Sequence, residues 1–68
     1  MRVLLVEDDD PLRDVLLELL RQRGWNVHAA ARGDEALELA RRVSIDLSIM
    51  DFHLPGLTGL EVFRRIAR

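Results

Sequence analysis

The spacing of hydrophobic residues along the chain changes from a strand-like to a helix-like pattern and back, and each change marks the border of a predicted element. Residues 3–6 are all apolar and lead directly into the acidic residues 7–10, a pattern typical of a strand buried on both faces of a parallel sheet. Over residues 12–20 the apolar residues recur at helical spacing, and Gly24 follows arginines that suit the end of a helix. The pattern therefore predicts a strand followed by a helix.

The first helix is predicted to open with Asp10 as its N-cap and Pro11 as its first helical residue. Its apolar residues follow the i, i+3, i+4, i+7 spacing of a helix that packs on a sheet. The predicted packing face consists of Leu12, Val15, Leu16, Leu19 and Leu20.

A second strand and helix follow. Residues 25–30 alternate, with Trp25, Val27 and Ala29 on one side, as expected for an edge strand half exposed to water. The second helix should run from Gly33 to about Arg42 and carries small residues that let it lie close to a sheet.

The last strand and helix complete the pattern. Residues 45–50 form a compact strand that stops at Asp51, and a third helix over residues 60–67 follows the break at Pro55. The order is βαβαβα within one domain, residues 1–68. It predicts an α/β fold with a three-stranded parallel sheet, strand order 2-1-3, right-handed crossovers and three helices.

Composition narrows the class of protein. The chain has 49% hydrophobic residues, a net charge of −2 and no cysteine, which favours a small globular domain and excludes a disulfide framework. Direct nucleic-acid binding is not expected from this charge. The longest apolar runs are only a few residues and no basic, apolar leader precedes the first strand, so we expect a cytoplasmic protein without a membrane partner.

Acidic residues follow two of the predicted strands. Glu7 and Asp8 come after the first strand and Asp51 after the third, and the carboxyl ends of parallel strands lie at one edge of a sheet. Clustered carboxylates repel one another unless a cation neutralises them. An all-oxygen ligand set favours a hard ion such as Mg²⁺. The simpler alternative is that Asp8, Asp9 and Asp10 only cap the first helix and solvate the turn, while Asp51 starts a loop.

The motifs resemble those of the receiver domains of two-component response regulators. They are Val6-Glu7-Asp8-Asp9 after an apolar strand, Gly33-Asp34-Glu35-Ala36-Leu37 at the start of a helix, and Asp51-Phe52-His53-Leu54-Pro55-Gly56-Leu57-Thr58-Gly59 after another strand. The resemblance covers the whole chain. It implies a flavodoxin-like fold and a signalling module, not an enzyme.

The resemblance also implies roles for individual residues. Asp51 is the expected phosphoacceptor, and a histidine kinase or a small phosphodonor is expected to supply the phosphoryl group. Glu7 and Asp8 form the acidic pair, Glu7 acting through a metal-bound water, and the backbone carbonyl of His53 completes the Mg²⁺ site with Asp51. The imidazole of His53 is expected to be chemically idle.

The resemblance implies that a complete receiver domain consists of five βα units, and the pattern here covers three. The Ser or Thr and the Lys that contact the phosphoryl group in the family have no counterpart, and the 68 residues contain no lysine. We therefore expect impaired phosphotransfer in this N-terminal half of a receiver, and completion of the open sheet by a homodimer or higher oligomer. The alternatives are a self-associating half-domain with a structural role and, less favoured, a small phosphatase, since no general acid or base follows Asp51 at a useful spacing.

Overall fold

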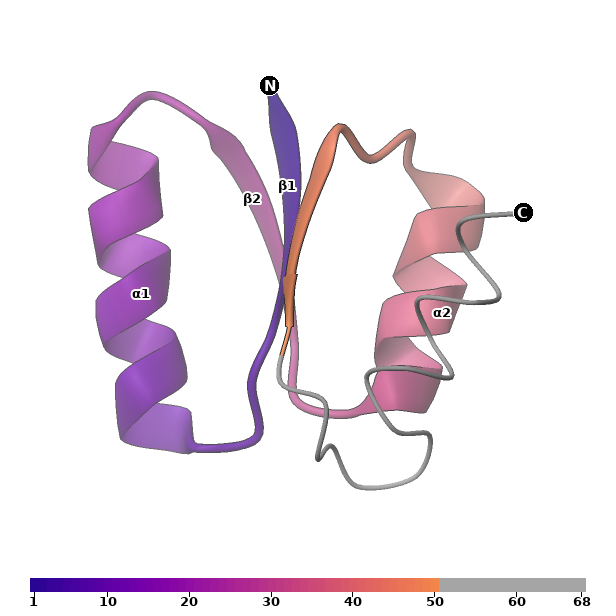
Figure 1. Cartoon of the computed structure of the whole chain (residues 1–68), viewed down its shortest axis with the longest axis horizontal. Coiled ribbons are helices and arrows are strands. Elements are labelled where there is room, and N and C mark those ends of the chain that lie inside the picture. The colour runs from indigo at the N-terminus through magenta and orange to yellow at the C-terminus, as the bar shows by residue number, and fades with distance from the viewer. Residues whose placement is uncertain (51–68) are drawn as a thin grey trace.

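The computed structural model describes residues 1–50, so the predicted third helix lies outside the described residues. Within them the chain forms three strands and two helices in alternation (Figure 1). Their bounds are β1 Arg2–Val6, α1 Asp10–Gln22, β2 Asn26–Ala30, α2 Gly33–Arg42 and β3 Leu47–Met50. Neither helix among these residues is long and apolar enough to span a membrane.

The strands form a parallel sheet of order β2-β1-β3, as predicted. In the register, Val3 pairs with Val27 on one side and with Leu47 on the other. Figure 1 shows α1 and α2 on opposite faces of this sheet, which gives the three layers of an α/β fold. The central strand is therefore covered from both sides.

The apolar run of β1 supplies both halves of the core. Successive strand residues point to opposite faces, so Val3 and Leu5 pack on the α1 side while Leu4 and Val6 pack on the α2 side. All four are at most 1% exposed. The uninterrupted hydrophobic sequence is thus explained by burial on both faces.

Helix α2 has the predicted bounds, Gly33 to Arg42. Ala36 is fully buried against Leu4, Val6 and Ala30, and its small side chain allows the helix to approach the sheet closely. The expectation of a small-residue contact is confirmed at this position.

Val27 and Ala29 of β2 share one side of the sheet as predicted, because they pair with Val3 and Leu5, but the burial of β2 differs from the prediction at its end. Val27 is buried on the α1 side, but Ala29 is exposed and Ala30 is buried on the α2 side. The cause is that both faces of this strand are covered by helices, so its burial does not follow a single face. Trp25 precedes the strand and packs against the Val3, Leu5 and Val27 cluster.

The predicted N-cap of α1 is also wrong by one residue. Asp9, not Asp10, has the extended backbone of an N-cap, and its carboxylate accepts a hydrogen bond of 3.0 Å from the Leu12 amide. Asp10 is already helical and pairs with Arg13. Pro11 fits either arrangement because the first-turn amides of a helix have no partner within it.

The end of α1 agrees with the prediction. Gly24 has a φ of 82°, a left-handed conformation that glycine adopts at little cost, and its amide donates to the Arg21 carbonyl at 2.9 Å. This turn sends the chain back along the sheet into β2.

The packing face of α1 is rotated from the predicted one. Leu16, Leu17 and Leu20 contact the core, whereas Leu12, Val15 and Leu19 are 44–56% exposed. On β3, two further residues pair with Val3 and Leu5 and therefore lie on the α1 side of the sheet, and they are 36–39% exposed. We call the five exposed residues the apolar patch: Leu12, Val15, Leu19, Leu47 and Ile49.

The cap assignment predicts different effects for neighbouring aspartates. Asp9→Ala should lower the free energy of unfolding by about 1 kcal/mol, because the Leu12 amide loses its acceptor. Asp14→Ala removes an equal charge from an exposed position of α1 and should change stability little. Urea denaturation followed by circular dichroism measures both. A larger loss in Asp10→Ala than in Asp9→Ala would contradict the assignment.

Candidate acidic site at the carboxyl end of the sheet

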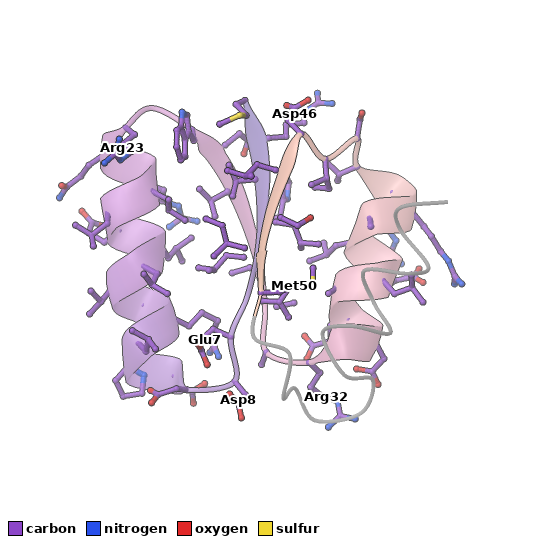
Figure 2. All side chains as sticks on the ribbon, in the orientation of Figure 1. Glu7, Asp8, Arg23, Arg32, Asp46 and Met50 are labelled. Carbon is purple, nitrogen blue, oxygen red and sulfur yellow. The ribbon has the colours of Figure 1, made fainter. Side chains whose placement is uncertain are left out.

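Glu7 continues β1 beyond its last strand residue. Its amide donates to the Ala30 carbonyl at 3.0 Å, which extends the β1–β2 ladder by one step. Its half-buried side chain turns back, and Oε2 accepts a 3.2 Å hydrogen bond from the Asp9 amide. In Figure 2, Glu7 lies between α1 and the sheet. The residue is therefore held through both its backbone and its carboxylate.

Asp8 is the next residue and has a different environment. It is exposed, and among the described residues no hydrogen bond or ion pair engages its carboxylate. Figure 2 shows its side chain pointing away from the sheet. Asp8 thus offers a solvent-accessible carboxylate between two neighbours whose positions are fixed.

The register brings the ends of β1 and β3 together. Val6 pairs with Met50, so each strand ends beside the other, and Figure 2 shows Met50 at the same end of the sheet as Glu7 and Asp8. Asp51 is the residue that follows Met50 in the sequence. Asp51 and His53 lie outside the described residues, and their roles stay predictions.

Glu7 and Asp8 suit a hard cation. Residues 1–50 contain no group of three or more acidic, histidine or cysteine side chains arranged to hold a metal, so the pair by itself is not a complete site. It does supply exposed carboxylate oxygen, the donor that Mg²⁺ prefers, and the ion usually needs only one or two carboxylates from a protein. The fit is to half of the predicted ligand set.

Arg13 is a residue of this region that the sequence reasoning missed. One terminal nitrogen donates to the Glu7 carbonyl at 3.0 Å, and the other pairs with the Asp10 carboxylate at 2.6 Å. Its side chain is only 20% exposed although it carries a charge. Its spacing of three residues after Asp10 indicates the ion pair, but no local pattern indicates the contact with Glu7.

A second charged pair lies at the start of α2, after β2. The Arg32 guanidinium donates to Asp34 at 3.1 Å, and the Glu35 amide donates to the same carboxylate at 3.0 Å. The hydrogen bond from Arg32, more than any other contact, lowers the pKa of Asp34 below its ordinary value of 3.8. Asp34 therefore stabilises the folded state in its ionised form.

Comparison with known proteins identifies the class. The family model of the response regulator receiver domain matches residues 3–68, and the chain belongs to this family. The parallel sheet with acidic residues after its central strand agrees with that assignment.

Individual relatives are similar over nearly the whole chain. The transcriptional regulatory protein AfsQ1 of Streptomyces coelicolor is 46% identical over 97% of this chain, which spans only 29% of that relative's length. The receiver domain of the hybrid histidine kinase CckA has a TM-score of 0.93 and 42% identity, over 98% of this chain and 64% of that one. The response regulator TrrA of Thermotoga maritima, solved in complex with Mg²⁺ and BeF, has a TM-score of 0.89 and 38% identity, over 96% and 56%.

The lowered pKa of Asp34 predicts a pH dependence. Its contribution is fully present above pH 3.8 and is lost as the pH falls through the lower folded-state pKa. Asp34→Asn should therefore have a lower Tm than the parent chain at neutral pH, and the two should converge in acid. Asp14→Asn is the charge-matched control in thermal melts across the pH range. A Tm difference for Asp34→Asn that does not change with pH would contradict the prediction.

Proposed function

We propose that the chain is a phosphoacceptor module of two-component signalling in which Asp51 accepts the phosphoryl group and Mg²⁺ is bound by Asp8, Asp51, the His53 carbonyl and, through water, Glu7. The observation that carries the proposal is the pairing of Val6 with Met50. The pairing supports the proposal because Glu7 and Asp8 follow β1 in the sequence and Asp51 follows β3, and these two strands are neighbours.

The proposed reaction uses a carboxylate as nucleophile. An Asp51 oxygen forms a bond to phosphorus while the bond from phosphorus to the donor breaks, and the donor leaves with its electron pair. With acetyl phosphate the leaving group is acetate, and with a phosphohistidine it is the imidazole. A bound Mg²⁺ would offset the negative charge on the phosphoryl oxygens.

Two similarities support the donor and the cofactor. CckA is described as a hybrid histidine kinase, which favours a histidine kinase as the phosphodonor of this chain. TrrA was solved with Mg²⁺, which favours the same ion here. A signalling role without turnover, and a cytoplasmic location, agree with such a module and stay predictions.

Transfer within these 68 residues should be slow. They contain no lysine, so the cationic contact to the phosphoryl group that the resemblance implies has no source among them. Hydrogen bonds to charged groups contribute about 1.5–3 kcal/mol each, enough to reduce transfer roughly tenfold or more without abolishing it.

The proposal predicts a phosphoryl adduct at one residue. Incubation with acetyl phosphate and Mg²⁺ should add a phosphoryl group to the parent chain, detected by intact mass, and Asp51→Asn should abolish the adduct. Asp46→Asn is the matched control: Asp46 precedes β3 at the opposite end from Met50 (Figure 2), and an asparagine there can still accept from the Arg2 amide, which donates to Asp46 at 2.7 Å. An adduct that persists in Asp51→Asn refutes the assignment.

A second proposal is self-association of the chain through the apolar patch. Among the described residues β3 pairs only with β1, so its outer edge is open beside Leu47 and Ile49. A second copy offers the same open edge and the same apolar residues, and a two-fold interface requires such a self-complementary surface.

Self-association predicts a mass of twice 7.8 kDa in light scattering at micromolar concentration. Leu19→Glu, which places a charge in the patch, should shift the chain toward the monomer. Ser44→Glu adds the same charge at an exposed position after α2 and should not. A monomeric parent chain with a cooperative thermal transition rules the dimer out.

A further inference from the structure

Arg13 connects the first turn of α1 to the β1–α1 loop, residues 7–9. Its guanidinium donates to the Glu7 carbonyl at 3.0 Å, while the Glu7 amide is held by the Ala30 carbonyl at 3.0 Å. The peptide group on each side of Glu7 is thus anchored to a different element, β2 through the amide and α1 through the carbonyl. Together these contacts fix the backbone direction with which the chain enters Asp8.

The other flank of Asp8 is fixed as well. The Asp9 amide donates to Glu7 Oε2, and the Asp9 carboxylate caps α1 at the Leu12 amide. The Arg13 amide donates to the Asp9 carbonyl at 2.8 Å, so Arg13 holds the loop through its backbone and its side chain. Asp8 lies between these anchors with an exposed carboxylate.

We infer that Arg13 is a positioning residue for the cation site: it holds the β1–α1 loop so that the Asp8 carboxylate is presented in one orientation. The inference rests on the proposed function and assigns to that site a residue that does not itself touch the cation. Residues that orient metal ligands typically change metal affinity 10–100-fold when removed. The pairing with Asp10 holds the guanidinium in the direction of Glu7.

Charge alone would give a different result. If Arg13 acted only through its positive charge, it would repel a cation, and its removal would strengthen Mg²⁺ binding. If it acted only by packing its aliphatic stem, methionine would replace it. Of these three roles, only positioning predicts that loss of the Arg13 hydrogen bonds weakens Mg²⁺ binding, although the substitution also removes a positive charge near the site.

The test is a titration of the 68-residue chain with Mg²⁺. Binding is measured by calorimetry and by NMR shifts of the Asp8 and Asp9 amide resonances. Arg13→Met keeps the stem and should weaken Mg²⁺ binding about tenfold. Arg13→Lys can reach one acceptor at a time and should recover part of the loss. Arg21→Met, an exposed position on the same helix, should bind like the parent chain.

A readout without the cation separates orientation from general stability. In Arg13→Met without Mg²⁺, the Asp8 and Asp9 amides should lose order, seen as lower relaxation order parameters, while those of β1 stay unchanged. If Arg13→Met fails to fold, Arg13→Lys carries the same comparison. Mg²⁺ affinity in Arg13→Met equal to or above that of the parent overturns the inference and leaves the proposed function standing. A parent chain that binds no Mg²⁺ overturns both.

Discussion

The structure depends on the burial of β1 between two helical layers. Its four apolar residues, Val3 to Val6, are at most 1% exposed, and both core clusters are built around them. Burying a side chain of this kind contributes about 1.5–3 kcal/mol. Because β1 pairs with a strand on each side, its position also determines where β2 and β3 end. The burial of β1 therefore determines where the acidic residues that follow it lie.

That constraint explains which parts of the fold could be predicted. A strand buried on both faces needs a continuous apolar run, and a helix that lies close to a sheet needs a small residue such as Ala36, so β1 and α2 are apparent from local sequence. The sheet order follows from placing β1, with its continuous apolar run, in the centre, and right-handed crossovers then put the two helices on opposite faces. None of these steps requires knowledge of distant contacts.

Apart from the one-residue shift of the α1 N-cap, the differences from the predictions share one physical cause, which is dependence on a neighbouring element. Ala29 and Ala30 are the same residue type, and only the positions of the two helices decide that Ala30 is buried. Leu12 and Leu16 both fit the helical face, but the approach of α1 to β1 and β2 buries one side of that face more than the other. For the same reason the role of Arg13 could not be predicted, because its acceptor is the Glu7 backbone carbonyl in the preceding loop.

The four consecutive acids of the β1–α1 loop show how the structure separates residues that look equivalent in sequence. The Glu7 carboxylate accepts from the Asp9 amide, the Asp9 carboxylate caps α1, and Asp10 pairs with Arg13. Each of these three contacts neutralises or occupies a carboxylate within the protein. Within residues 1–50, Asp8 is the one of the four whose carboxylate has no such contact, and it is exposed at the same end of the sheet as Met50 (Figure 2). A carboxylate in that position costs little free energy because water solvates it, and it can bind a cation favourably. The contacts of its three neighbours therefore leave Asp8 available for its proposed role.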